Sequence, residues 1–450
     1  MRSVKLTTAK FLSVLFVICG LQLGASAQEN SPYSRYGLGD LTPNHNVFTR
    51  GMGGIAAAQL DNQSINFTNP SSLANINNTI FDVAAEADFR TLKRTNPAGK
   101  FNSANAYFSY LQMAFPLTTP KMFKKGIRWG MSFGIRPVTK INYKIETNTP
   151  PTAGIDSLNT VYEGSGGLNQ AFFGTGLRIK NFSIGINAGY MFGNKDYSTK
   201  LTFISDSVHY YQSNSANKTR YGGLFINGGM QYDIAVEKDK NGNVKRNIRL
   251  GVYGNLQQNI SASNDLIRET IVYDGNGNIH RLDSVYEELD VKGKIKYPAM
   301  IGAGFSYQGN NLIYGADFEF GNWSNYRYYG KKDLVQNSWI IRAGAQYYPA
   351  KENTPVKKYF NFVKYRAGFY YGNDYINTGK NRPEYGFTVG TGMPLTSLRR
   401  VSYTGEYVVL NTALEIGNRG NKQTNLRENI VRFSVGISMN ARWFQKPKYQ

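Results

Sequence analysis

The chain has 450 residues, of which 41% are hydrophobic, 14% aromatic and 18% charged, and its formal net charge is +22. Abundant tyrosine, phenylalanine and glycine favour strands and turns over helices, so we expect an all-β protein. After the first 27 residues, no apolar run reaches the roughly 18 residues that a transmembrane helix needs. A role in a membrane would therefore require a barrel.

The amino terminus has the composition of a secretory signal. Three basic residues precede an apolar run over 11–23, and Ala25-Ser26-Ala27 follows that run. This pattern predicts cleavage after Ala27 and export of the mature chain. Cys19 is the only cysteine and lies within the signal, so we expect neither a disulfide nor thiol chemistry in the mature protein.

The mature chain is strongly basic. Loss of the three basic signal residues leaves a formal charge of +19. A basic exported protein meets acidic polymers and anionic lipid head groups, which in an outer membrane include lipopolysaccharide. Export makes nucleic acid the least expected partner, so we predict no nucleic-acid binding.

A stretch rich in small residues follows, over 50–73, with the sequence RGMGGIAAAQLDNQSINFTNPSSL. Its small side chains let one backbone segment pass close to another, and Pro70 after Asn69 fixes a bend without offering a donor. Such a segment suits a confined space, although a surface loop has the same composition.

Candidate strands begin at Thr79. Most of them exceed the five or six residues usual in soluble sheets, and they approach or exceed the roughly 9 to 11 residues of a tilted transmembrane strand. Fourteen are predicted, at 79–92, 104–117, 126–146, 161–180, 181–205, 218–236, 247–265, 290–307, 311–325, 335–349, 358–373, 382–394, 400–416 and 427–444. The longest predicted loop, 266–289, follows the seventh strand.

The candidate strands alternate apolar and polar residues. In the last strand one face carries Val431, Phe433, Val435, Ile437 and Met439, and the other carries Arg432, Ser434, Gly436, Ser438 and Asn440. Lipid on one face and a polar lumen on the other demand this pattern. The sheet must close, because an open edge in hydrocarbon leaves backbone groups unpaired. A soluble sandwich also alternates, but with shorter strands.

We therefore predict an all-β fold, a transmembrane antiparallel β-barrel of about 14 strands. The predicted layout is a signal peptide over 1–27, an N-terminal segment over 28–78 and the barrel over 79–450.

In these features the chain resembles the FadL-type outer-membrane transporters. Trp443-Phe444 at the end of the last strand resembles the aromatic carboxy-terminal signal of outer-membrane barrels. The hatch of the FadL family has a glycine- and alanine-rich run, then Asp, then Asn-Pro and a small residue. The matching residues here are Gly51, Gly53, Gly54, Asp61, Asn69 and Pro70.

The resemblance implies an N-terminal hatch that plugs the barrel, an outer-membrane location and passive uptake of hydrophobic, fatty-acid-like molecules. In this family a kink in the third strand opens a lateral gap. Pro137 interrupts the third predicted strand here, and proline removes a ladder donor. It either marks such a kink or ends the membrane part of a strand whose upper half projects outward.

The inward faces of the predicted strands collect charged residues. The basic ones are Arg128, Arg136, Arg178, Arg249, Arg342, Arg366, Arg432 and Arg442, and the acidic ones are Asp82, Glu86, Asp88, Asp233, Asp317, Glu319 and Glu406. They either pair into a network that fixes the hatch or line a path for an anionic ligand. An apolar conduit would present more apolar side chains inward. The alternative function is therefore a non-transporting barrel subunit of a protein complex, similar to the barrel partner in type IX secretion or an accessory subunit of barrel assembly.

Other chemical motifs are weak. The sequence from Asp274 to Asn278 begins like a calcium loop, but Ile279 and Val285 occupy the positions of its glycine and bidentate glutamate, so we expect a hairpin turn. The three histidines lack metal-ligand spacing. We predict no enzyme activity, no metal and no cofactor.

Overall fold

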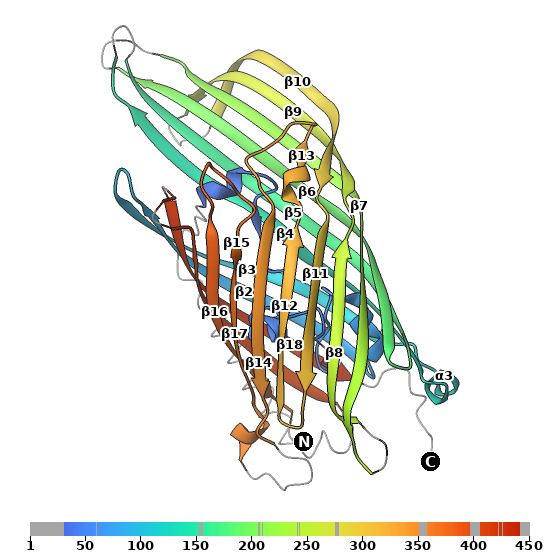
Figure 1. Cartoon of the computed structure of the whole chain (residues 1–450). Coiled ribbons are helices and arrows are strands. Elements are labelled where there is room, and N and C mark those ends of the chain that lie inside the picture. The colour runs from blue at the N-terminus through green and yellow to red at the C-terminus, as the bar shows by residue number, and fades with distance from the viewer. Residues whose placement is uncertain are drawn as a thin grey trace, which may run out of the picture.

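Fourteen strands form a closed antiparallel barrel in the part of the chain that the computed structural model describes (Figure 1). The described residues are 31–59, 61–152, 156–205, 208, 210–240, 242, 244–274, 279–350, 358–396, 406–421, 423–424 and 426–441. The wall strands, in order around the barrel, are β2 (Thr79–Arg94), β3 (Gly99–Pro116), β4 (Ile127–Thr149), β5 (Ser157–Ile179), β6 (Phe182–Ile204), β7 (Gln212–Lys238), β8 (Val244–Asn255), β11 (Met300–Gln308), β12 (Leu312–Gly321), β14 (Ser338–Tyr347), β15 (Lys364–Asn373), β16 (Pro383–Pro394), β17 (Tyr407–Arg419) and β18 (Leu426–Ala441).

The barrel closes where its last strand meets its first. β18 pairs with β2 along its whole length, from Leu426 opposite Arg94 to Ala441 opposite Thr79. The predicted fold class and strand number are confirmed. Closure leaves no open sheet edge at this junction, as hydrocarbon requires.

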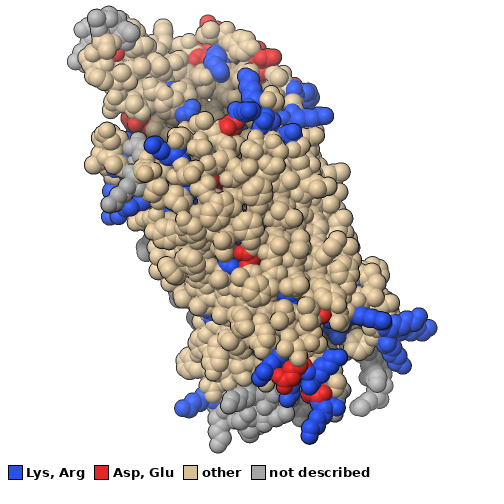
Figure 2. All heavy atoms as spheres, in the orientation of Figure 1, with Lys and Arg blue, Asp and Glu red and all other residues tan. Residues whose placement is uncertain are grey.

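The outer surface of the wall is apolar over its middle. In β6, Ile184 and Ile186 are exposed whereas Ser183 and Asn187 are buried, so the period-two pattern places apolar side chains outward. Charged side chains gather toward the two ends of the molecule, and the broad band between them is nearly free of them in the view of Figure 2. Such a band faces lipid in outer-membrane barrels.

One side of the barrel extends beyond the band. β4, β5, β6 and β7 each have 23 or more residues, which exceeds the roughly 9 to 11 needed to cross the bilayer. A hairpin of β9 (Gln258–Tyr273) and β10 (Ile279–Tyr297) adds to this extension through pairing of β9 with β7 (Figure 1). Long structures of this kind belong to the extracellular end of outer-membrane barrels.

The hairpin corrects the sequence prediction. The predicted strands 247–265 and 290–307 each break into two, and the predicted loop 266–289 is mostly the β9–β10 hairpin. The physical reason is that this hairpin lies outside the lipid band. Its side chains are exposed on both faces of β10, so no apolar alternation marks it as a strand.

An N-terminal segment, which we define as residues 31–78, lies inside the barrel wall (Figure 1). It contains η1 (Pro32–Arg35), β1 (Asp40–Leu41), α2 (Val47–Arg50) and η2 (Pro70–Asn75). Its start is held at the extracellular end, where the Tyr33 hydroxyl donates to the Leu426 carbonyl. Its end leads into β2 at the periplasmic end. The segment therefore traverses the lumen from one mouth to the other.

Short elements complete the described structure. They are α3 (Pro120–Lys124) between β3 and β4, η3 (Trp323–Asn325) and β13 (Arg327–Tyr328) between β12 and β14, and η4 (Tyr359–Phe362) before β15. None of the helices in the described ranges is long and apolar enough to cross a membrane.

Several predicted features lie outside the described residues. They are the signal with Cys19, the mature terminus at Gln28, the aromatic end Trp443-Phe444, Arg442, and four residues of the turn between Asp274 and Ile279. The strands on either side of that turn pair directly, with Tyr273 opposite Ile279.

Candidate functional site

The lumen is the candidate site because the N-terminal segment and most of the buried charges meet there. The segment packs directly on the backbone of the wall, at glycines that have no side chain to keep it away. A Cβ atom added to Gly176 of β5 would lie 2.6 Å from the Pro70 carbonyl oxygen. At Gly251 of β8 an added Cβ would meet the backbone of Ala57 and Ala58. Inward-facing glycine is thus a steric requirement of the filled lumen.

The three glycines of the predicted hatch lie against β14, β15 and β16. Gly53 has a φ of +70°, and a Cβ there would lie 2.8 Å from the Ala343 carbonyl oxygen and 2.9 Å from that of Phe369. Gly51 approaches the Cα atom of Gly390. Gly54, with a φ of +85°, lies beside the side chains of Arg342 and His45. Both the backbone conformation and the space favour glycine at position 53.

Asn69 and Pro70 organise the second half of the segment. The Asn69 amide donates to the carbonyl oxygens of Ala57 at 2.6 Å and Val252 at 3.3 Å. Its side-chain oxygen accepts from the backbone N–H and hydroxyl of Ser71, at 3.2 and 2.7 Å, and so caps η2. Pro70 occupies the first position of η2, where no N–H donor is needed. Asp61 lies apart from this group, 3.5 Å from the Lys364 ammonium.

We expect Asn69→Ala to lower the free energy of unfolding by about 1–3 kcal/mol, because buried carbonyl oxygens and the η2 cap lose their bonds to the fully buried amide. Urea unfolding of the protein in lipid vesicles measures the change. Asn62→Ala is the matched control, since Asn62 belongs to the same segment and is exposed. An equal loss in both variants would contradict this role of Asn69.

A network of buried ion pairs joins the segment to the wall. Arg50 of α2 pairs with Glu86 of β2 and donates to the Ser109 hydroxyl at 2.7 Å. Arg432 of β18 pairs with the same Glu86 at 2.7 Å and with Glu415 of β17 at 2.9 Å. Buried charges persist when they are paired in this way. The network therefore attaches three wall strands to α2.

The predicted lumen arginines fall into three groups. Arg342 pairs with Glu319 at 3.3 Å, and Arg178 and Arg249 share Asp233 at 2.9 and 2.5 Å near the periplasmic end. Arg136 and Arg366 donate to side-chain amides, of Gln170 and of Gln346 and Asn411 respectively, each at 2.9 Å. Arg128 stacks on Phe123 of α3, with its guanidinium carbon 5.3 Å from the ring centre. The structure does not bring these arginines to one point.

A second cluster of charges closes the extracellular mouth, and sequence reasoning missed it. Arg382 pairs with Asp374 at 2.5 Å and with Glu428 at 2.8 Å. Arg419 pairs with Asp40 of the N-terminal segment at 2.7 Å and with Glu384 at 3.0 Å. Asp374 and Arg382 lie in a loop, where no alternation indicates the direction of a side chain. The only signal was the polar stretch SPYSRYGLGD over 31–40.

Aromatic residues pack around this mouth. Tyr375, in the loop between β15 and β16, donates to the carbonyl oxygens of Gly39 and of Tyr36, the latter at 3.4 Å. Burial, together with the carboxylate of Asp374, raises the pKa of Tyr375 well above its usual value, so the hydroxyl stays protonated and able to donate. Trp323 lies 4.2 Å from the Tyr375 ring, centre to centre. The start of the segment is thus held by both charge and packing.

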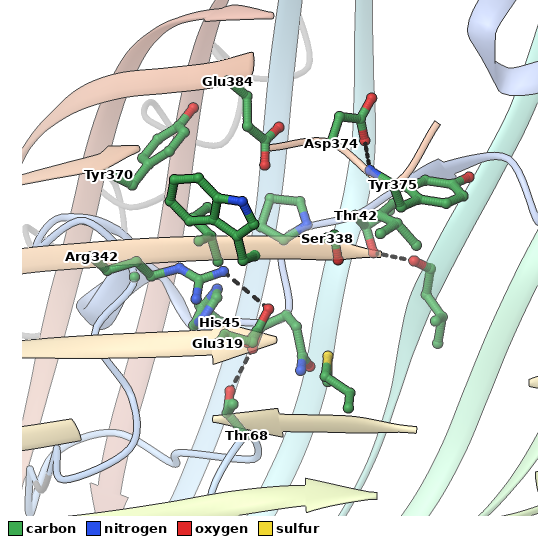
Figure 3. Close-up of a pocket in the computed structure, with 18 of the residues that line it drawn as sticks. Thr42, His45, Thr68, Glu319, Ser338, Arg342, Tyr370, Asp374, Tyr375 and Glu384 are labelled. Atoms are coloured by element: carbon green, nitrogen blue, oxygen red, sulfur yellow. Dashed lines mark hydrogen bonds and ion pairs between the residues drawn. The ribbon is translucent and has the colours of Figure 1, made fainter. Parts of the chain in front are cut away.

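A cavity of about 200 Å³ lies between the ion-pair network around α2 and the charge cluster at the extracellular mouth (Figure 3). Figure 3 shows Arg342 directed toward Glu319 and lying beside His45, with Glu384 above them in this view and Asp374 accepting from the Tyr375 backbone N–H. The charged lining residues are Asp40, Glu319, Asp374, Glu384 and Glu415, and Arg50, Arg136, Arg342, Arg419 and Arg432. Charges of the two signs are matched, and apolar side chains such as Phe225, Trp323 and Ile340 lie among them, so the lining is mixed rather than purely apolar. Among the described residues, no three His, Cys, Asp or Glu side chains gather as metal ligands would.

Pro137 lies where the third wall strand changes register. β4 runs unbroken through Pro137, but its pairing with β5 shifts between Pro137 and Thr139. Below this point β4 pairs with β3, from Gly130 to Ile135. Above it, Lys140 and Thr139 pair with Asp40 and Leu41 of β1 instead.

Comparison with solved structures identifies the fold as that of FadL-type outer-membrane channels. A FadL homologue of Pseudomonas aeruginosa is 12% identical, with a TM-score of 0.54, and the match covers 90% of this chain and 99% of that one. The toluene transporter TodX of P. putida is 12% identical, with a TM-score of 0.52 and coverage of 90% and 100%. The toluene transporter TbuX of Ralstonia pickettii is 13% identical, with a TM-score of 0.50 and coverage of 88% and 98%.

Comparison by sequence gives the family. No curated protein matches the chain significantly. The model of the BamG family matches residues 8–450, which is nearly the whole sequence. The chain therefore belongs to the BamG family.

Proposed function

We propose that this protein is a non-transporting barrel subunit of an outer-membrane barrel-assembly complex. The observation that carries the proposal is membership of the BamG family over residues 8–450, since the family's name is that of a component of the barrel-assembly machinery. In such a complex the barrel serves as a docking body in the membrane. The protein is exported, enters the outer membrane and acts there through protein contacts.

The filled lumen supports a structural role. In this proposal residues 28–78 are the plug of the barrel and residues 79–450 its wall. Gly51, Gly53, Gly54, Asn69 and Pro70 would fit the plug to the wall, and Asp61 would anchor it through Lys364. Paired charges and backbone-to-backbone packing hold the plug at both mouths, so it is fixed in place rather than poised to move.

Uptake of hydrophobic molecules is the second candidate. The fold shared with toluene transporters and the register shift at Pro137 favour it. The charges of the cavity weigh against it, because a site for a fatty acid or an aromatic hydrocarbon holds few polar groups, whereas five carboxylates and five guanidinium groups lie among the apolar lining side chains here. We therefore rank uptake below a role in barrel assembly.

Purification of the tagged full-length protein from native membranes distinguishes the two functions. We expect the central barrel of the assembly machinery to co-purify in near-stoichiometric amount, and native mass spectrometry to show an empty lumen. Recovery of the protein alone, with a bound fatty acid or hydrocarbon, would overturn the proposal in favour of uptake.

A further inference from the structure

The wall has one seam at which neighbouring strands separate. β3 pairs with β2 from Gly99 to Ala114, but with β4 only from Leu111 to Pro116. Figure 1 shows the β2–β3 hairpin diverging from the taller β4 and β5. Among the described residues, no strand pairs with the β4-facing edge of β3 over residues 99–110.

The two edges of the seam are treated differently. The edge of β4 is covered from within over 138–140, because β1 pairs with Thr139 and Lys140 and the Thr42 N–H donates to the Val138 carbonyl at 3.0 Å. The edge of β3 receives only side-chain contacts. The Lys140 ammonium lies over the Tyr107 ring, and Arg50 donates to the Ser109 hydroxyl. Among the described residues, the edge of β3 over 99–110 has no partner strand, and the facing edge of β4 above Ile135 has one only at Thr139 and Lys140.

Part of this edge lies at the depth of the hydrocarbon. A membrane strand needs about 9 to 11 residues to cross the bilayer. If β2 enters the hydrocarbon at Ile80, near the periplasmic end, it leaves the hydrocarbon at about Arg90. Phe89, exposed on the outer surface near that limit, is opposite Ala104 of β3. The unpaired stretch from Ala104 to Tyr110 is therefore in the outer leaflet. Lipid offers no partners for a row of backbone N–H and C=O groups, so another strand is the group that satisfies them.

Comparison with a free edge outside the lipid band strengthens this argument. β10 also has an edge without a partner over most of its length, but outside the lipid band, and it carries three register shifts against β9. It also bears several charges, including Glu287, Glu288 and Asp290. Bulges and charges are the devices that keep an edge from pairing. From Gly99 to Tyr110 the only charged residue is Lys100, and β3 has a single register shift against β2.

The outer surface beside this edge is shaped for close approach. Ala85 and Ala87 of β2 and Ala104 and Ala106 of β3 occupy alternating positions that face lipid. Outward alanines also occur on fully paired strands, such as Ala316 of β12 opposite Ala343 of β14, so the small side chains matter here because they flank a free edge. Small side chains let neighbouring protein come close in a membrane, where packing drives association.

The geometry points to one occupant: an extended strand of a second outer-membrane barrel protein, which adds to the free edge of β3 between Ala104 and Tyr110. Backbone hydrogen bonds supply the affinity in this mode of recognition, and side-chain fit supplies the specificity. The inference rests on the proposed function, because it identifies the surface through which the subunit would contact another barrel of the assembly complex.

Photo-crosslinking in native outer membranes tests it. p-Benzoylphenylalanine replaces Ala106 in one full-length protein and Ala316 in another. Ala316 is the matched control: it faces outward near the middle of β12, whose two edges are paired with β11 and β14. We expect an adduct with another outer-membrane barrel protein at position 106, at least about five-fold above position 316, because β3 offers a free edge there and β12 does not. Protein adducts at equal or background level would overturn the inference.

Lysine substitutions separate pairing from mere proximity. Lysine blocks edge pairing, so Ala104→Lys with Ala106→Lys should abolish the adduct formed by a photo-crosslinker at Phe108, while Ala316→Lys should leave it unchanged. Ala316→Lys also controls for the cost of a lysine facing lipid. An unchanged adduct in the double variant would overturn strand addition.

The two proposals fail in distinguishable ways. Co-purification of the assembly complex without an adduct at position 106 would overturn the edge contact and leave the proposed function standing. An adduct with a barrel outside the assembly machinery would support the edge contact and contradict the proposed function.

Discussion

Replacing Arg432 by methionine is expected to lower the free energy of unfolding by about 3–5 kcal/mol, the loss typical of removing one member of a buried ion-pair network. Arg432 is 6% exposed and pairs with Glu86, Glu415 and, at 3.7 Å, Asp88. Methionine fills much of the same volume but leaves carboxylates in the lumen with too little compensating charge. Both the barrel wall and α2 are destabilised, because Arg50 of α2 and Arg432 of β18 pair with the same residue, Glu86.

Chemical unfolding of the protein in lipid vesicles, followed by tryptophan fluorescence, measures the loss. Arg220→Met is the control, since the Arg220 side chain is 69% exposed and pairs with Asp265 at the surface, where a pair contributes about 0–1 kcal/mol. Equal losses in the two variants would show that the lumen network does not hold the barrel together.

Gly251→Val is expected to displace the N-terminal segment and to lower the free energy of unfolding by about 1–3 kcal/mol, as overpacking does. A Cβ atom at this position would lie 2.8 Å from the backbone nitrogen of Ala58 and closer still to the Ala57 carbonyl. Backbone of the segment, rather than a flexible side chain, would have to move. Because the segment fills the lumen, its displacement should also raise the conductance of the protein in planar bilayers.

Gly228→Val provides the control for this experiment. Gly228 is in neighbouring β7, and an added Cβ there would meet only the Gly185 carbonyl oxygen, at 3.6 Å. We expect this variant to keep the conductance and stability of the natural protein. Unchanged conductance in Gly251→Val would argue against the segment as a plug.

The strand pattern of the barrel wall was predictable because it is local. In β18, Val431, Phe433 and Met439 are exposed on the outer surface, and Arg432 and Ser434 are buried in the lumen, as the period-two alternation predicted. Lipid imposes this pattern on every strand that it touches. Fold class and strand number follow from counting such segments.

Where the chain does not contact lipid, the sequence shows no such alternation and does not indicate which side chains face inward. Residues 266–289 were predicted as a loop because most of β10 is exposed to water on both faces, so no apolar face marks it as a strand. The charges at the extracellular mouth were missed for a related reason. Asp374 and Arg382 lie in a loop and pair with each other, and Arg382 also pairs with Glu428 of β18, which comes from elsewhere in the barrel.

The sequence by itself determined a closed antiparallel barrel of about fourteen strands with an apolar outer surface, because alternation is fixed by neighbours along one strand. It also indicated that the inward faces carry charge. Only the tertiary structure decided which charges pair, since Glu86 and Arg432 are far apart in sequence and meet only when β18 closes onto β2. Only the tertiary structure left the edge of β3 unpaired, because its pairing with β4 stops at Leu111 and Ile135, and β1 from inside the barrel takes Thr139 and Lys140 of β4 instead.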